Sequence, residues 1–150
     1  MAARAGAIVP GQSRQAVVVE DLRRTMIVQY AGASGDFNPL HTDEVYASRA
    51  AGYPGVFAHG MLTMAMAGRV LTDWVGVEAL TAFGARFKAQ VWPGDTLTTT
   101  VTAESVTAAS GSVVGESVSV VGAVVRFVLS TRNQDGVEVL SGTASARLEP

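Results

Sequence analysis

Residues 60–75 constrain the fold more than any other part of the chain. They read Gly-Met-Leu-Thr-Met-Ala-Met-Ala-Gly-Arg-Val-Leu-Thr-Asp-Trp-Val, and only Arg69 and Asp73 carry charge. A helix formed by this run is apolar nearly all round, which is typical of a buried helix. Its methionines are typical of side chains that fill irregular gaps in a core. We therefore expect a helix over 60–75 with the rest of the chain wrapped closely around it.

After Gly76 the hydrophobic period changes to two, the period of a strand with one buried face. The first strand is expected at 83–91, and its predicted buried face consists of Phe83, Ala85, Phe87, Ala89 and Val91. Further strands are expected at 97–103, 118–131, 137–148 and 17–19. The Ser- and Gly-rich segment 108–117 is typical of a loose hairpin connection. About five antiparallel strands and one apolar helix predict an α+β fold, in which the sheet curls round the helix and buries it on more than one side.

Two further helices are expected before residue 60. Apolar residues recur at helical spacing from Leu22 to Ala33, and the helix should end at Gly32–Gly35. Glu20 and Asp21 are placed where negative charge favours a helix N-terminus. A shorter helix is expected at 43–51, closed by Gly52.

Length and composition exclude several classes of protein. The chain has 150 residues, which predicts one domain over 1–150. It has no cysteine, so disulfide scaffolds and thiolate chemistry are excluded. Its net charge of -2 offers no basic excess for nucleic acid. We find no secretory signal and no apolar run long enough to span a membrane, so a cytoplasmic location is expected.

The chain has only two histidines, His41 and His59, and both fall in one polar-rich region. Asp36 precedes His41 by five residues on a loop stiffened by glycine and proline. A carboxylate and an imidazole can share general acid and base duties on one water molecule. The same residues also occur in ordinary turns and surface pairs. Composition alone therefore does not decide between a catalytic pair and an ordinary turn.

The second candidate region is His59-Gly60-Met61, at the start of the apolar helix. A glycine there exposes a free backbone N–H at the positive end of the helix dipole, which suits an oxyanion. Alternatively, Gly60 only relieves crowding, and His59 has a supporting role beside a buried polar group.

Other chemistries have weaker signals. Both histidines with Asp36 or Asp43 could formally bind a metal, but no tight ligand spacing such as H-E-x-x-H is present. Ser34-Gly35 lacks the flanks of a nucleophile elbow. The glycines form neither a phosphate-binding loop nor a dinucleotide fingerprint.

Together these motifs resemble the MaoC-like dehydratases, the family of R-specific enoyl-CoA hydratases. That family's signature is approximately Y-A-x-x-S-G-D-x-N-P-[IL]-H-x-D, followed some fifteen residues later by H-G-M. The chain fits it at Tyr30, Ala31, Ser34, Gly35, Asp36, Asn38, Pro39, Leu40, His41, Asp43, His59, Gly60 and Met61. The strand and turn over 87–97 also resemble the family. The chain looks close to the mycobacterial beta-hydroxyacyl dehydratase subunit that carries the catalytic pair.

The resemblance implies a hotdog fold and a hydratase. Asp36 and His41 would activate the water that adds to a trans-2-enoyl thioester, giving the (3R)-hydroxyacyl product, and the reverse reaction would be dehydration. Gly60 would polarise the thioester carbonyl, Ser34 and Asn38 would support the loop, and His59 would support the catalytic residues without contacting the substrate. No metal and no redox cofactor is implied, because the coenzyme A or acyl-carrier-protein thioester is itself part of the substrate. Arg86 and Lys88 are weak candidates for phosphate contacts.

The resemblance also implies a homodimer, or a heterodimer with a second hotdog subunit. Residues 104–130 carry no motif that decides between them. Two other functions stay open. A non-catalytic thioester-binding subunit would be expected to lack Asp36 or His41. A hotdog thioesterase usually carries its acidic residue on or beside the central helix, whose first half here has none.

Overall fold

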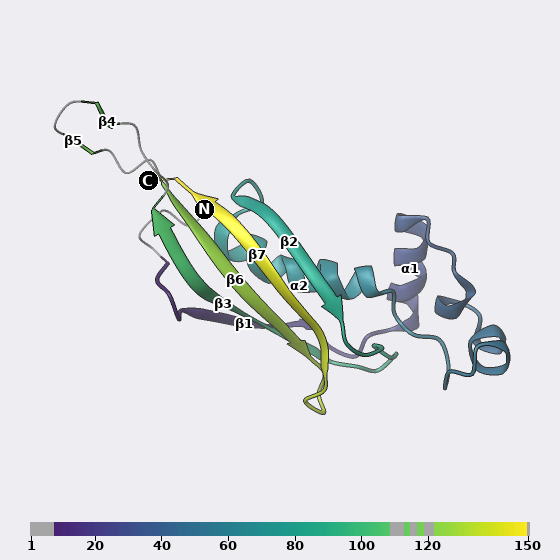
Figure 1. Ribbon diagram of the computed structural model, residues 1–150. Coiled ribbons are helices and arrows are strands. Elements are labelled where there is room, and N and C mark those ends of the chain that lie inside the picture. The colour runs from purple at the N-terminus through teal and green to yellow at the C-terminus, as the bar shows by residue number, and fades with distance from the viewer. Residues whose placement is uncertain (1–7, 109–112, 115–116, 119–121, 150) are drawn as a thin grey trace.

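A five-stranded antiparallel sheet with one long helix against it forms the body of the protein (Figure 1). The computed structural model describes residues 8–108, 113–114, 117–118 and 122–149. The strands in sheet order are β1 (Ser13–Val19), β3 (Leu97–Ala108), β6 (Ala123–Arg132), β7 (Glu138–Leu148) and β2 (Leu80–Phe87). The expected α+β class and the five expected strands are confirmed. β1 and β2 form the two edges of this sheet.

Helix α2 (Gly60–Val75) has the bounds that the sequence predicts. The side facing the sheet is buried, and Leu71 and Val75 have no exposed surface. The opposite side carries an outer stripe, which we define as Met61, Met64, Ala65, Gly68 and Arg69. Met61 is 54% exposed, and Ala65 and Arg69 are also exposed. Strands at both edges of the sheet, β1 and β2, contact α2, so the sheet curls round the helix as expected and leaves the outer stripe as the side that this chain does not cover.

Helix α1 (Arg24–Ser34) confirms the first expected helix, but it begins later than the acidic pair suggests. Asp21 has a φ of 48° and precedes the N-cap, so neither Glu20 nor Asp21 lies in the first turn. The backbone is held there by tertiary contacts, since the Leu22 N–H donates to the Asp95 carbonyl at 2.8 Å. The helix ends at Gly35, whose left-handed φ of 73° lets its N–H bond the Ala31 carbonyl.

The segment between α1 and α2 contains two short helices, η1 (Pro39–His41) and η2 (Tyr46–Ala50). The expected helix at 43–51 is present, but its last turn is π-helical rather than α-helical. Gly52 closes it with a φ of 76°. Figure 1 shows that α1, η1 and η2 lie beyond the N-terminal end of α2, away from the sheet.

Strand β2 is shorter than predicted at its C-terminal end. It ends at Phe87, which is 47% exposed, although the alternating pattern continues to Val91. Its partner β7 runs antiparallel and begins at Glu138. Only two residues of β7 therefore remain beyond the Phe87–Leu140 pair. Val91 is buried without being in a strand, and its carbonyl accepts the Ala58 N–H at 2.8 Å.

The remaining expectations concern β6 and the connection before it. The expected strand at 118–131 corresponds to β6, and residues 119–121 lie outside the described residues. Of the expected loose hairpin at 108–117, β4 (Val113–Val114) pairs with β5 (Ser117–Val118), and residues 109–112 and 115–116 lie outside the described part. Among the helices that the structure describes, none has the length and hydropathy needed to cross a bilayer.

Candidate active site

The loop after α1 is ordered by its own side chains. The Ser34 hydroxyl donates to the Tyr30 carbonyl at 2.7 Å and accepts the Asp36 N–H at 3.3 Å. Asp36 Oδ1 accepts the Asn38 N–H at 3.2 Å, and Asn38 Oδ1 accepts the Leu40 N–H at 3.1 Å. Such side-chain to backbone bonds replace helix or strand pairing in turns. They fix the carboxylate of Asp36 at the surface of the loop.

His41 is held by a backbone carbonyl from the segment before α2. Its Nδ1 lies 2.7 Å from the Phe57 carbonyl oxygen, which can only accept, so Nδ1 carries the proton. In the neutral ring, Nε2 therefore presents a free lone pair. The His41 side chain is 9% exposed. Burial lowers the pKa of His41, and the neighbouring His59 adds to this effect, against the opposing effects of the Phe57 carbonyl and Asp36.

His59 contacts both the loop that carries Asp36 and the ring of His41. It is 1% exposed, and its Nε2–H donates to the backbone carbonyl of Asp36 at 3.0 Å. Its ring stacks on that of His41, with centroids 3.8 Å apart and planes inclined by 31°. The Tyr30 ring lies 5.0 Å away on another side. His59 thus contacts both members of the Asp36–His41 pair.

The structure brings Asp36, His41 and His59 together, with one donor atom of each within 4.8 Å of the others. Stacked imidazoles direct their in-plane lone pairs side by side, not toward one point, and one nitrogen of each ring bonds a carbonyl. This arrangement suits proton transfer better than metal ligation. Asp43 lies outside the group, and its Oδ1 accepts the Tyr46 N–H at 3.0 Å at the start of η2.

Gly60 is the first residue of α2 and lies under the ring of Phe87. A Cβ atom built on Gly60 would lie 3.0 Å from a ring carbon of Phe87. The first N–H groups of a helix have no acceptor within the helix, so they face outward at this end. Sequence reasoning did not assign Phe87 to the site, because strand periodicity places it in the core.

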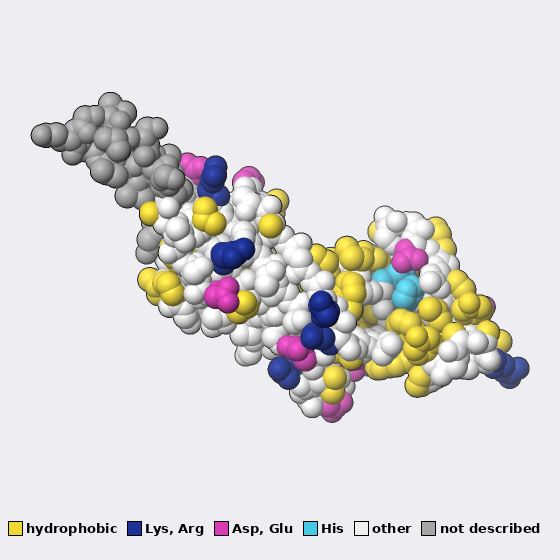
Figure 2. Space-filling view, in the orientation of Figure 1, with side chains coloured by type: hydrophobic (Ala, Val, Ile, Leu, Met, Phe, Trp, Pro, Cys, Tyr) yellow, Lys and Arg dark blue, Asp and Glu magenta, His cyan; other side chains and the backbone are white. Residues whose placement is uncertain are grey.

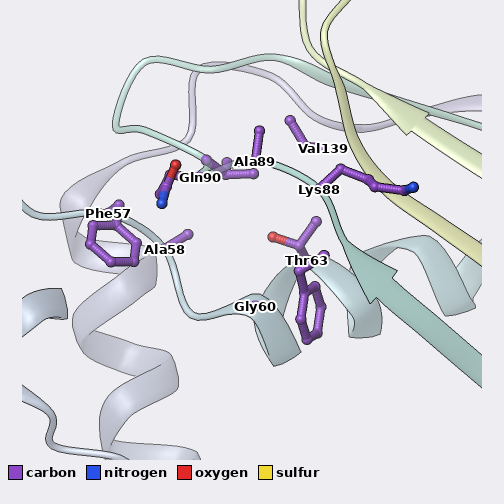
Figure 3. Close-up of a pocket in the computed structure, with 10 residues that line it drawn as sticks. Phe57, Ala58, Gly60, Thr63, Lys88, Ala89, Gln90 and Val139 are labelled. Carbon is purple, nitrogen blue, oxygen red and sulfur yellow. The ribbon is translucent and has the colours of Figure 1, made fainter.

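Two hollows lie on either side of the first turn of α2. One is a cavity of about 290 Å³ lined by Phe57, Ala58, Gly60, Thr63, Phe87, Lys88, Ala89, Gln90, Val91 and Val139 (Figure 3). The other is a groove of about 370 Å³, where Tyr30, Leu80 and Phe83 face the outer stripe of α2. Figure 2 shows histidine atoms, coloured cyan, in a recess between hydrophobic side chains, with an acidic side chain beside them.

A model of the family described as "MaoC like domain" matches residues 6–124. The chain belongs to the MaoC-like domain family. The resemblance noted in the sequence is thereby confirmed. Among relatives, the 3-hydroxyacyl-thioester dehydratase Y of Mycobacterium tuberculosis is 42% identical over 71 residues, which cover 45% of this chain and 24% of that protein. The match thus spans about a quarter of the relative's length.

Solved structures of other proteins have the same fold. The R-hydratase PhaJ1 of Pseudomonas aeruginosa gives a TM-score of 0.75 at 23% identity, covering 97% of this chain and 85% of that chain. The ChsH1–ChsH2 complex of Mycobacterium tuberculosis gives a TM-score of 0.67 at 20% identity. The match covers 94% of this chain and 98% of that chain. At such identities the likeness establishes the fold alone, and it confirms the hotdog expectation.

Proposed function

We propose that the protein hydrates trans-2-enoyl thioesters to (3R)-hydroxyacyl thioesters and catalyses the reverse dehydration. The observation that carries the proposal is the free Nε2 of His41 beside the Asp36 carboxylate. Membership in the MaoC-like family and the dehydratase name of the M. tuberculosis relative support this class of reaction. Coenzyme A or acyl carrier protein would supply the thiol part of the substrate.

In the proposed reaction, His41 and Asp36 hold one water molecule between them. The water oxygen forms a bond to the β-carbon as His41 Nε2 takes one of its protons. The π electrons of the double bond move toward the thioester, and the α-carbon then receives a proton from the pair. The pair ends in its starting protonation state. The elements of water are added across the double bond and no electrons pass to another group, so the step needs no redox cofactor.

Gly60 is proposed to stabilise the charge that develops on the thioester oxygen. A backbone N–H at the start of α2 offers a donor and the positive end of the helix dipole to an enolate-like oxygen. A Cβ at this position would lie 3.0 Å from a ring carbon of Phe87, so a larger residue would require the ring to move. Ser34 and Asn38 support the loop through the bonds described above.

The outer stripe of α2 supports a dimer as the working form. It leaves Met61 54% exposed on a helix that is otherwise typical of a core. A second copy covering the stripe would also enclose the groove beside Phe83 as an apolar channel for the acyl chain. A different hotdog subunit could cover the stripe instead, as the name of the ChsH1–ChsH2 complex illustrates for that pair.

The test is a hydration assay with crotonyl-CoA. The purified protein should consume the enoyl absorbance and form 3-hydroxybutyryl-CoA of R configuration by chiral analysis. Release of free thiol without hydration would instead identify a thioesterase. If the enoyl absorbance does not fall, either with the protein alone or with a second hotdog subunit present, the proposal is overturned.

A further inference from the structure

The two helical segments on either side of the proposed catalytic loop are joined by an ion pair. A guanidinium nitrogen of Arg24, the first residue of α1, lies 2.6 Å from Oε2 of Glu44, which follows η1. Asp36 and His41 lie between these two residues in the chain. Figure 1 shows that this stretch lies beyond the N-terminal end of α2, and it takes no part in the sheet. The ion pair therefore closes a loop around the proposed catalytic pair.

The enclosed end of the Glu44 carboxylate distinguishes this ion pair from an ordinary surface pair. The Glu44 side chain is 45% exposed, but its Oε2 atom, which faces Arg24, is buried. Exposed ion pairs contribute little because water and salt screen them, and a buried oxygen is screened less. Helix α1 has no acidic residue in its first turn, so the charge that meets Arg24 comes from the far end of the loop.

Gly55 brings a third segment against the same carboxylate. A Cβ atom built on Gly55 would lie 2.6 Å from Glu44 Oε1, so a side chain there would have to displace the carboxylate. The φ of Gly55 is not in the left-handed region, so the backbone conformation does not require glycine at this position. The missing side chain at 55 thus lets the Glu44 carboxylate pack against the segment that leads to Phe57.

Phe57 lies two residues beyond Gly55 and orients His41. Its carbonyl oxygen accepts the Nδ1–H of His41 at 2.7 Å, and its N–H donates to the Leu40 carbonyl at 3.4 Å. A displacement of the backbone at Gly55 would therefore reach the acceptor that fixes the tautomer of His41. The tautomer with the proton on Nδ1 is the one that presents the lone pair of Nε2 to water.

We propose that Glu44, held by Arg24, is a positioning residue that keeps the Phe57 carbonyl in place and so fixes the tautomer of His41. Glu44 acts through residues 55–57 and not by contact with the substrate. In its kinetic consequences the proposal rests on the proposed hydratase function, whereas the tautomer is observed in the protein without substrate.

Nuclear magnetic resonance of protein labelled with ¹⁵N-histidine tests the tautomer directly. The chain has only two histidines, so the spectrum contains two rings, and His41→Ala assigns them. Glu44→Gln, Arg24→Gln and Gly55→Ala should each lower the ratio of the Nδ1–H to the Nε2–H form of His41. The expected change is about three- to tenfold, the size of one neutral hydrogen bond. An unchanged ratio in any of the three folded variants overturns the proposal, and thermal unfolding checks the fold.

The pKa of His41 separates an effect of position from an effect of charge. The titratable groups that act on His41 are Asp36 and His59, and the three variants leave both in place. The Phe57 carbonyl raises the pKa of His41, so a weaker bond should lower it. By charge alone, loss of the carboxylate would lower this pKa and loss of the guanidinium would raise it. We expect a lower pKa in all three variants, and a higher pKa in Arg24→Gln overturns the proposal.

A double-variant cycle tests whether Gly55 acts through Glu44. Glu44→Ala removes the carboxylate that a side chain at 55 would displace. The double variant Glu44→Ala/Gly55→Ala should therefore have the same tautomer ratio as Glu44→Ala alone. Losses that add would show that Gly55→Ala disturbs residues 55–57 independently of the carboxylate, and they would overturn the role of Glu44.

Kinetics with crotonyl-CoA measure the consequence for the proposed reaction. Each of the three single variants should lower kcat by about three- to tenfold and leave KM within about twofold. Glu138→Gln is the matched control, because Glu138 pairs with Arg132 at 3.8 Å where β6 ends and β7 begins, and it should retain wild-type kcat. Changed tautomer ratios in a protein without hydratase activity would overturn the hydratase function but not the positioning role. Unchanged ratios with intact hydration would overturn the positioning role alone.

Discussion

The rings of His41 and His59 stack with centroids 3.8 Å apart, and each ring donates one N–H to a backbone carbonyl. Two stacked imidazoles cannot both be protonated without repulsion between like charges. His59 therefore adds to the burial that lowers the pKa of His41, and a neutral His41 is the form that can accept a proton from water.

The first prediction concerns pH. Because burial lowers the pKa of His41 from its ordinary value of 6.5, the proposed base should remain active below that pH. The acid limb of the kcat/KM profile should lie below pH 6.5, and NMR titration of His41 should follow it. A limb above 6.5 would contradict this assignment. The same lowered pKa also makes the free energy of unfolding fall as the pH falls, since the unfolded chain binds the proton more readily than the folded chain. The contribution of His41 should be present above 6.5 and decrease as the pH falls through 6.5 toward the folded-state pKa.

The second prediction concerns the proposed catalytic pair. Asp36→Asn and His41→Ala should each lower kcat by about 100-fold or more, the contribution typical of general acid–base groups. Asp73→Asn is a matched carboxylate control on the exposed side of α2, and it should retain wild-type kcat. Thermal unfolding of each variant checks the fold. Full activity of either variant would falsify the proposed role of the residue that it changes.

The third prediction concerns His59 as a positioning residue. His59→Ala removes the bond to the Asp36 carbonyl and the stack on His41, so kcat should fall more than KM rises. The lost bond and the cavity should also lower the free energy of unfolding by about 2–4 kcal/mol. His59→Gln keeps a side-chain N–H donor and should recover part of kcat. Equal kcat for the Gln and Ala variants would show that the bond to Asp36 is unimportant.

The fourth prediction separates the two explanations of Gly60. Gly60→Ala places a methyl group 3.0 Å from the Phe87 ring and should lower both kcat/KM and stability. Phe87→Ala removes that clash. If Gly60 only relieves crowding, the double variant should recover the activity of Phe87→Ala alone. We expect stability to recover and kcat to remain low, because the methyl group still occupies the thioester position; kinetics and thermal unfolding measure the two effects.

The fifth prediction concerns the outer stripe of α2. Ala65→Glu places a charge at its centre, four residues before Arg69, where a Glu–Arg pair supports the isolated helix. The variant should be a folded monomer by light scattering and circular dichroism, whereas the wild type should be a dimer. Thr107→Glu, on the exposed end of β3, should remain dimeric. A dimeric Ala65→Glu variant would place the interface on another surface.

The sequence predicts the features that depend on local pattern. The bounds of α2 follow from glycines at 60 and 76 around an apolar run, and the alternating burial of β3 from Leu97 to Ala103 follows the residue pattern. The order within 34–41 is encoded by Ser34, Asp36 and Asn38, whose short polar side chains bond their own backbone.

Features that depend on distant partners could not be predicted. The Phe57 carbonyl orients His41, and no side chain in the sequence reveals a backbone acceptor. Phe87 has the period of a core residue, but the strand pairing of β2 with β7 ends at Phe87 and leaves it 47% exposed. An apolar helix surface indicates contact with something, and does not say whether that is the chain's own sheet, a ligand or another subunit.

The outer stripe of α2 has a thermodynamic consequence. Arg69 is its only charged member, so association through this surface depends on removal of apolar area from water, which salt does not screen. That driving force weakens on cooling. The assembled protein should therefore keep its subunits together in concentrated salt and lose them most readily in the cold.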